Sequence, residues 1–248
     1  PGRHALQLGR RRLGALRALA ALDFGPGAPL AEHAPDVVVP VEDAAIAPNG
    51  DIYVTGNFTV FDGGAANRIA RWNGSAWSAL GTGLDADGIH ISIDPTGRVY
   101  VGGSFSNAGG IPAFRVAYWD GSSWHAMGQY SGLNNNVNSI VISPGGDGIY
   151  LGGNFTDQIG WAINELLHVA RYDPVTDRFT QVGQGFNGNV LEVVLDSGEV
   201  LHACGEFTLS GTSAINRIGK FEGGSWIPLG TGMNNTVNSF DIGRNGDI

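Results

Sequence analysis

The sequence predicts an all-β protein built from repeated four-stranded antiparallel units, and three observations support this. The motif YVTGNFT (53–59) returns as YVGGSFS (100–106), YLGGNFT (150–156) and HACGEFT (202–208). Glycine supplies 40 of 248 residues without the G-X-Y period of collagen, so the excess is expected to serve turns and close strand packing. The shared glycines Gly56, Gly103, Gly153 and Gly205 follow one another at steps of 47, 50 and 52 residues. Steps of this length are typical of the four-stranded blades of a β-propeller.

The first two strands of each unit, a and b, are expected to form a tight antiparallel pair. Strand a is an apolar alternation that ends in a turn, as in VEDAAIAPNG (41–50), VNSIVISPGG (137–146) and VNSFDIGRNG (237–246). In the turns Pro48-Asn49-Gly50 and Pro95-Thr96-Gly97, proline presets φ and glycine accepts a positive φ. Strand b is the glycine motif itself. Its pairs Gly102-Gly103 and Gly152-Gly153 are expected to let strands approach closely where blades converge.

Strands c and d are predicted within a second repeated block. The block reads RIARWNGSAWSALG (68–81), RVAYWDGSSWHAMG (115–128), HVARYDPVTDRFTQVG (168–183) and RIGKFEGGSWIPLG (217–230). Asn73-Gly74 and Asp120-Gly121 are strong hairpin signals between these strands. Aromatic pairs flank the hairpin and are expected to fill the gap between blades, with a carbohydrate platform as the alternative: Trp72/Trp77, Trp119/Trp124, Tyr172/Phe179 and Phe221/Trp226.

The chain divides into an N-terminal arm, residues 1–36, and propeller repeats over 37–248. The repeats are expected at about 37–83, 84–131, 132–185 and 186–232, with a partial fifth at 233–248, because Asn245–Ile248 matches Asn49–Ile52. We therefore expect an incomplete ring in a natural protein that is longer at both ends, with a small four-bladed ring as the alternative. Residues 4–22 predict a short amphipathic helix, and Gly25-Pro26-Gly27 ends it. The arm is interpreted as a structural attachment segment, with docking to an acidic partner or targeting as alternatives.

Charge and composition exclude several classes of function. The net charge is −9, and residues 37–248 carry nine basic and 20 acidic groups, so this part should repel nucleic acid. No run approaches 18 apolar residues, so no membrane span is expected. The lone Cys204 permits no internal disulfide and leaves the redox compartment open.

Motifs for catalysis and cofactors are weak. G-x-G-x-x-G occurs at 183–188, but it lies between two expected strands, whereas a dinucleotide site needs a strand, a turn and a helix. The six histidines have no metal-binding spacing. Asp85 and Asp87 are weak candidates for a metal site, but asparagines at the corresponding positions of other blades favour a turn role in which the side chain accepts local backbone hydrogen bonds. No cofactor and no catalytic residue are predicted.

A partner is expected to bind one particular face of the repeats. In an up-and-down blade, the a–b and c–d turns share one face, and the longer b–c loops share the other with the d–a crossings. The b–c loop of the third repeat is three residues longer than the others and carries Trp161, which is either a binding anchor or a ring folded back over the next blade. The candidate binding residues on this loop face are Trp161, Asp157, Asn164, Glu165, Asp62, Asn107, Asn134, Asn136, Asn187 and Asn234.

These residues also carry a family resemblance. The runs IYLGGNFT and HVARYDPVTDRFTQVG resemble kelch-type propeller repeats, similar to galactose-oxidase-like central domains. WNGSAWSALGTG is similar to repeats of secreted bacterial surface proteins and of fungal Rax2-type cell-polarity proteins. The resemblance covers about residues 39–248 and implies a propeller without fixing a function. A copper oxidase would need a Tyr, Cys and His ligand set, which cannot be placed because Cys204 lies in an expected strand b.

The expected function is a non-catalytic interaction or adhesion module of a larger extracellular, cell-surface or virion-associated protein. Its partner would be a protein or glycan bound on the loop face. One alternative is a glycan-active hydrolase or lyase that uses two facing carboxylates, with candidates Asp62, Asp85, Asp87, Asp157 and Glu165. The other is a structural subunit, for instance of a phage tail, docked by its basic N-terminal arm.

Overall fold

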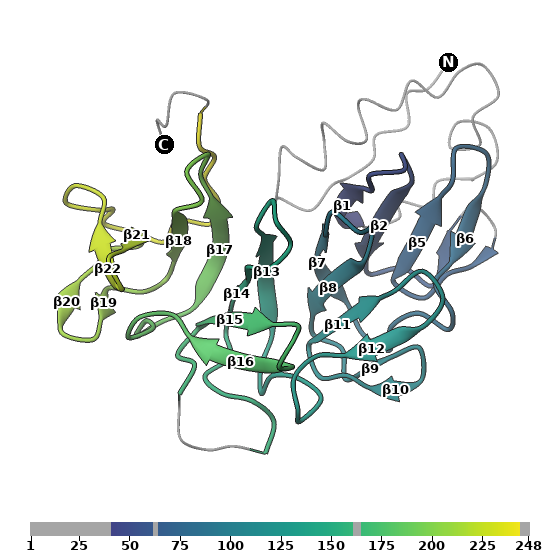
Figure 1. Ribbon diagram of the computed structural model, residues 1–248, viewed down its shortest axis with the longest axis horizontal. Coiled ribbons are helices and arrows are strands. Elements are labelled where there is room, and N and C mark those ends of the chain that lie inside the picture. The colour runs from purple at the N-terminus through teal and green to yellow at the C-terminus, as the bar shows by residue number, and fades with distance from the viewer. Residues whose placement is uncertain (1–40, 62–63, 161–164, 244–248) are drawn as a thin grey trace.

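Four antiparallel sheets of four strands each, blades 1 to 4, follow one another along the chain. The computed structural model describes residues 41–61, 64–160 and 165–243, and these residues form strands and no helix. The sheets are arranged side by side in an open arc, with the first strand of each blade on the inner side (Figure 1). This is the predicted all-β propeller architecture. The N-terminal arm and its expected helix lie outside the described residues.

Each blade pairs its strands in the order in which they were predicted. Blade 1 contains β1 (Val41–Ile46), β2 (Ile52–Gly56), β5 (Ile69–Trp72) and β6 (Trp77–Ala79). Blade 2 contains β7 (Gly88–Ile93), β8 (Val99–Gly103), β11 (Val116–Trp119) and β12 (Trp124–Ala126). Blade 3 contains β13 (Val137–Ile142), β14 (Ile149–Gly153), β15 (Val169–Asp173) and β16 (Arg178–Gln181). Blade 4 contains β17 (Val190–Leu195), β18 (Leu201–Gly205), β21 (Ile218–Glu222) and β22 (Ser225–Pro228).

Three of the four b–c connections contain a small hairpin of their own. These are β3 (Val60–Phe61) with β4 (Gly64–Ala65), β9 (Asn107–Ala108) with β10 (Ile111–Pro112), and β19 (Leu209–Ser210) with β20 (Ser213–Ala214). These segments were predicted to be loops. A signal for the second hairpin was present in Gly109-Gly110, because both glycines adopt the positive φ, 61° and 85°, that a two-residue hairpin turn favours.

The tight turns have the predicted chemistry. Gly50, Gly97 and Gly146 in the a–b turns have φ between 78° and 90°, and Gly74 and Gly121 in the c–d turns have φ of 94° and 102°. In the hairpin of blade 2, Asp120 Oδ1 accepts hydrogen bonds from two backbone N–H groups at 2.8 Å. The turns are therefore closed by short-range hydrogen bonds. The position of each blade relative to its neighbours depends instead on the faces where the blades meet.

Neighbouring blades fit together through matched large and small residues. A Cβ on Gly102 of blade 2 would lie 2.5 Å from Val137 Cγ1 of blade 3, and a Cβ on Gly152 would lie 2.4 Å from Val190 Cγ1 of blade 4. At the blade 1–2 interface the sizes are reversed, because Thr55 occupies the strand b position and Gly88 faces it from strand a. The predicted close approach at the glycine pairs is therefore confirmed, and each of the three interfaces contains a pair of complementary size.

The aromatic pairs of blades 2 to 4 pack against the preceding blade, as predicted, whereas Trp72 and Trp77 pack within blade 1. Trp124 and Trp226 are 7% and 4% exposed. Each indole Nε1 donates a hydrogen bond to a carbonyl of the preceding blade, Trp124 to Leu80 at 2.8 Å and Trp226 to Val182 at 3.0 Å. The interfaces are therefore held by polar bonds as well as by apolar clusters.

The inner strands are linked to one another by polar side chains. Each strand a has a β-bulge at its second residue, namely Glu42, Ile89, Asn138 and Leu191. The residue after the bulge reaches the next strand a: Asp43 Oδ2 accepts from Ile91 N at 3.0 Å, and Ser139 Oγ accepts from Val193 N at 3.2 Å. We call these contacts the axial ladder. They satisfy backbone donors on the edge of strand a that its partner strand does not cover.

Candidate functional site

The Asx residues of the d–a crossings hold the b–c loops of their own blades. Asp85 Oδ1 accepts from Ser106 N and Asn107 N at 2.8 and 2.9 Å. Asn134 Oδ1 accepts from Thr156 N and Asp157 N, at 2.9 and 3.1 Å, and Asn187 Oδ1 from Thr208 N and Leu209 N, at 2.8 and 2.9 Å. We call Asp85, Asn134 and Asn187 the loop clamps. The prediction that these side chains accept local backbone hydrogen bonds is wrong, because the bonds join residues 21 to 23 positions apart.

A buried apolar residue precedes each loop clamp. Leu84, Leu133 and Phe186 are at most 2% exposed. Leu84 and Leu133 form isolated β-bridges with Ala108 and Gln158 of the clamped loops, and Phe186 stacks on Phe207 with ring centroids 3.9 Å apart. Clamp and apolar residue therefore fix the base of each loop together, and the loop tips project from a rigid support.

The remaining predicted binding residues do not form one cluster. Asn107 Nδ2 donates to Asp85 Oδ2 at 2.7 Å, so its amide is engaged within the blade. Asn136 accepts from Asn154 N through its backbone carbonyl, and the Asp157 side chain is only 1% exposed and accepts from Gln158 N. Glu165 and Asn234 are exposed. Asp62, Trp161 and Asn164 lie outside the described residues.

The carboxylates Asp85 and Asp87 are engaged in contacts within the fold. Burial of Asp85 acts to raise its pKa, but hydrogen bonds from Asn107 and Ser106 outweigh it and lower the pKa. Asp87 Oδ1 lies 3.6 Å from Arg68 Nε. Within residues 41–61, 64–160 and 165–243, no group of three or more His, Cys, Asp or Glu side chains could hold a metal ion.

Three arginines and one histidine support the start of strand c in a strained backbone conformation. Arg68, Arg115, His168 and Arg217 have φ between 62° and 73°, which is uncommon for residues other than glycine. Arg115 and Arg217 donate from Nη1 to the carbonyls of Ser104 and Glu206 at the end of strand b, and His168 Nδ1 lies 3.3 Å from the Gly153 carbonyl. This role was not predicted from the sequence. The repeated basic residue at the head of each c block was the available signal.

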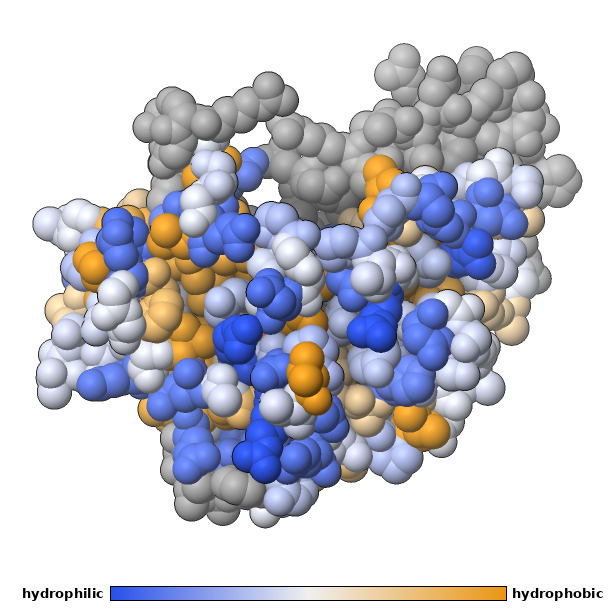
Figure 2. All heavy atoms as spheres, in the orientation of Figure 1, coloured by the Kyte–Doolittle hydropathy of each residue, from blue (hydrophilic) through white to orange (hydrophobic). Residues whose placement is uncertain are grey.

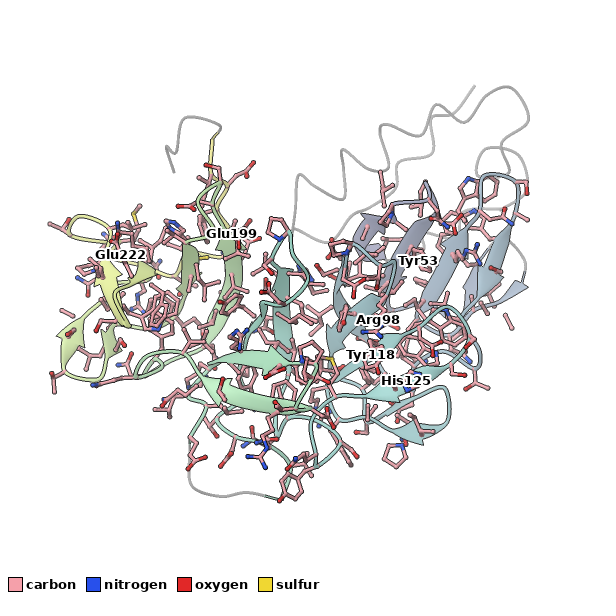
Figure 3. All side chains as sticks on the ribbon, viewed as in Figure 1. Tyr53, Arg98, Tyr118, His125, Glu199 and Glu222 are labelled. Atoms are coloured by element: carbon pink, nitrogen blue, oxygen red, sulfur yellow. The ribbon has the colours of Figure 1, made fainter. Side chains whose placement is uncertain are left out.

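A stacked group of side chains lies on blade 2, away from the loop clamps. Figure 3 labels its members Arg98, Tyr118 and His125. Arg98 Cζ lies 5.7 Å from the Tyr118 ring centroid, and the His125 ring stacks on Tyr118 at 4.8 Å. His125 Nε2 lies 2.7 Å from Asp120 Oδ2, and this contact, with the backbone donors of the turn, holds the Asp120 pKa well below its usual range. The group is therefore an internally paired surface cluster.

Polar residues also meet where the inner strands converge. His90 Nε2 lies 3.6 Å from Asp43 Oδ2, and both side chains are buried. Together with Glu42, Asn138 and Glu192 they border a cavity of about 10 Å³. A cavity of this size has room for about one water molecule.

Large apolar side chains are exposed on the small hairpins: Ile111 lies beside its two-residue turn, whereas Val60 and Leu209 lie in the strand pairs farther from their turns. Val60 in β3 is 53% exposed, Ile111 in β10 is 38% exposed, and Leu209 in β19 is 39% exposed. We call these three residues the hairpin tips. On the face drawn in Figure 2, apolar residues interrupt a mostly hydrophilic surface rather than covering it. The binding residues predicted on these loops were mostly polar, and these apolar residues were not among them.

The repeated four-stranded sheets, their inner strands and their clamped loops define a protein of the β-propeller class. The Rax2 C-terminal beta propeller domain matches residues 124–247, half of the chain, and the chain belongs to this family. A β-propeller domain of unknown function, DUF5122, also matches residues 47–74 and 95–117. No curated protein matches the chain. These matches agree with the resemblance to Rax2-type repeats noted in the sequence.

A separate question is whether any described segment could cross a bilayer as a helix. Within the part of the chain that the structure describes, no helix has the length and hydropathy for that.

Proposed function

We propose that this β-propeller is a non-catalytic interaction module of a larger extracellular, cell-surface or virion-associated protein, and that it binds its partner through the hairpin tips. The observation that carries this proposal is the exposure of Val60, Ile111 and Leu209 on three separate b–c connections. Exposed apolar residues on a polar surface are typical of binding sites for other proteins. A protein partner is therefore favoured over a glycan.

The rigidity of the loop bases supports a binding role. In blades 2 and 4, Asp85 and Asn187 each fix two backbone N–H groups immediately before or within the small hairpin. A surface that is already ordered loses less conformational entropy when it binds, which favours affinity. The engagement of Asp85, Asp87 and Asp157 within the fold also favours binding over a carboxylate-dependent hydrolysis.

The proposal is tested with a triple variant of the tips, Val60→Ser, Ile111→Ser and Leu209→Ser. Fluorescently labelled wild-type and variant chains are titrated onto intact cells, envelopes or particles of the source, and bound label is measured. We expect the triple variant to bind at least tenfold more weakly. The matched control is Ile46→Ser with Val175→Ser, which removes apolar residues that are 51% and 91% exposed, at the end of strand a of blade 1 and in the c–d turn of blade 3. This control should bind like the wild type.

Two results would contradict the proposal. Equal loss of binding in the control variant would mean that the loop face has no special role. Cleavage of members of a glycan panel by the wild-type chain, followed by mass spectrometry, would replace the binding role with an enzymatic one. Gradient fractionation of the native protein tests the compartment, because a soluble species that travels without envelopes or particles would argue against a surface or virion location.

A further inference from the structure

The position at the head of strand c carries a different side chain in blade 3. Arginine occupies it in blades 1, 2 and 4, as Arg68, Arg115 and Arg217, and His168 occupies it in blade 3. All four residues have a positive φ, so the backbone of this position is alike in every blade. An arginine stays charged throughout the pH range of a folded protein, whereas a histidine changes its charge at about pH 6.5. Blade 3 is therefore the one of the four blades in which this position titrates.

The arginines and the histidine are bound differently at the end of strand b. The guanidinium groups of Arg115 and Arg217 donate to the first carbonyl after strand b, that of Ser104 and Glu206. The shorter His168 side chain stops at Gly153, the last residue of strand b, with 3.3 Å between Nδ1 and the carbonyl oxygen. No described residue forms a hydrogen bond with His168 Nε2. A neutral imidazole with its proton on Nδ1 fits these contacts, because Nε2 then needs no acceptor.

Few charged groups surround the half-buried His168. The segments packed against it are the b–c connection itself, the d–a crossings 128–136 and 183–189, and the adjoining ends of strands b and c. Their charged or titratable groups are Tyr130, Asp157, Glu165, Arg171 and Glu206. Asp157 accepts from Gln158 N and Glu206 accepts from Asn189 Nδ2, so both carboxylates are bound to other groups. None of the five acts on the pKa of His168, which burial lowers and the Gly153 carbonyl raises to a smaller extent.

The backbone before His168 is strained at two successive residues. Leu167 and His168 have φ of 42° and 73°, whereas the residue before each arginine has no positive φ. Such conformations persist in residues other than glycine only where surrounding contacts hold them. Here Leu166 N donates to Thr156 O at 3.0 Å and His168 N to Phe155 O at 2.8 Å. Loss of a contact at His168 would therefore release the base of this connection first.

We propose that protonation of His168 loosens the base of the blade 3 b–c connection, so that this part of the loop face is ordered at neutral pH and opens in mildly acidic solution. An imidazolium carries a second N–H, on Nε2, which has no acceptor among the described residues, and it places a charge among neutral groups. Because the pKa of His168 is lowered in the folded state, its contribution to stability is complete above about pH 6.5 and is lost as the pH falls through the folded pKa.

The proposal is tested by hydrogen exchange with mass spectrometry on the full chain, from about pH 7.5 to about pH 5. Wild type, His168→Arg and His168→Gln are compared at each pH in peptides that cover residues 153–157 and 165–169. A ratio of rates at one pH removes the intrinsic pH dependence of exchange. It also cancels the titration of His90, His125 and His202, which all three chains retain. We expect wild-type exchange to rise at least about twofold relative to both variants as the pH falls.

The two variants control for each other, because one is always charged at position 168 and the other always neutral. Their ratio to one another should not change with pH, and circular dichroism verifies that both fold. Residues 103–107 of blade 2, held by Arg115, are the internal control and should exchange alike in all three chains.

Three results would overturn the proposal. A ratio of wild type to variants that is constant with pH would mean that His168 does not titrate in this range. A ratio that falls in acid would mean that the imidazolium holds strand b as the guanidinium does. An equal rise in residues 103–107 would mean that the whole chain loosens. The experiment uses no binding partner, so its outcome is independent of whether the hairpin tips bind one.

Discussion

The fit between blades 2 and 3 is tested by Gly102→Ala together with its partner Val137. A Cβ at position 102 would lie 2.5 Å from Val137 Cγ1, 3.0 Å from Val137 Cβ and 3.3 Å from Ile140 Cδ1. Val137 and Ile140 are at most 1% exposed and cannot move into solvent. Such overpacking costs about 1–3 kcal/mol, and the reduced freedom of the unfolded chain returns about 0.4–1 kcal/mol. The net expectation is a destabilisation of about 1–2 kcal/mol.

The assay is a double-mutant cycle in urea, read by tryptophan fluorescence. Val137→Ala alone should cost about 2 kcal/mol, because it removes two buried methyl groups. In the double variant the new methyl occupies space that Val137 has left, so the loss should be smaller than the sum by about 1–2 kcal/mol. The control is Gly64→Ala, whose Cβ would meet nothing nearer than 3.6 Å. Additive losses, or a neutral Gly102→Ala, would refute the argument that these two side chains share one space.

Three further changes test the contacts that hold blades and loops. Trp124→Phe leaves the buried Leu80 carbonyl of blade 1 without its donor at 2.8 Å, and thermal unfolding should show a free energy of unfolding lower by about 1–3 kcal/mol. Trp77→Phe should lower it less, because Trp77 Nε1 has no hydrogen-bond partner among the described residues. Asp85→Ala should speed hydrogen exchange at the backbone N–H groups of residues 106–107. Because the pKa of Asp85 is lowered in the folded state, its contribution to stability is present above pH 3.8 and is lost as the pH falls further. Asp85→Asn should therefore flatten the acid limb of the stability curve between about pH 5 and 2. Glu192→Ala should make residues 237–243 more sensitive to limited proteolysis, because Phe240 N loses its acceptor. Glu192→Gln should not, since the amide oxygen can still accept this hydrogen bond. Unchanged cleavage in Glu192→Ala would contradict the argument that the axial ladder holds this segment.

The strands and turns could be predicted because their causes are local. Gly74 and Gly121 adopt the positive φ that Asn-Gly and Asp-Gly turns require, and the alternation of strand a is visible in ten residues. The β3–β4, β9–β10 and β19–β20 hairpins were missed because each strand has only two residues, too few for a periodic pattern.

The candidate site was less accessible to sequence reasoning. The loop clamps were identified as a repeated Asx position, but their partners lie 21 to 23 residues away, and only the pairing of strands a and b brings them together. The axial ladder depends on a bulge that turns one side chain toward the next blade, and Asp43, His90, Ser139 and Glu192 share no residue type that would mark the position. Exposure of the hairpin tips likewise follows from the folded loops and not from their composition.

The reversal of sizes between Thr55–Gly88 and Gly102–Val137 has a consequence for how the repeats find one another during folding. Repeats of nearly identical sequence are prone to pair with the wrong neighbour. If strand b of blade 1 met strand a of blade 3, Thr55 would collide with Val137. The reversed pair therefore distinguishes the blade 1–2 interface from the blade 2–3 and 3–4 interfaces, which both pair glycine with valine, and it disfavours assemblies in which blade 1 packs against the wrong neighbour.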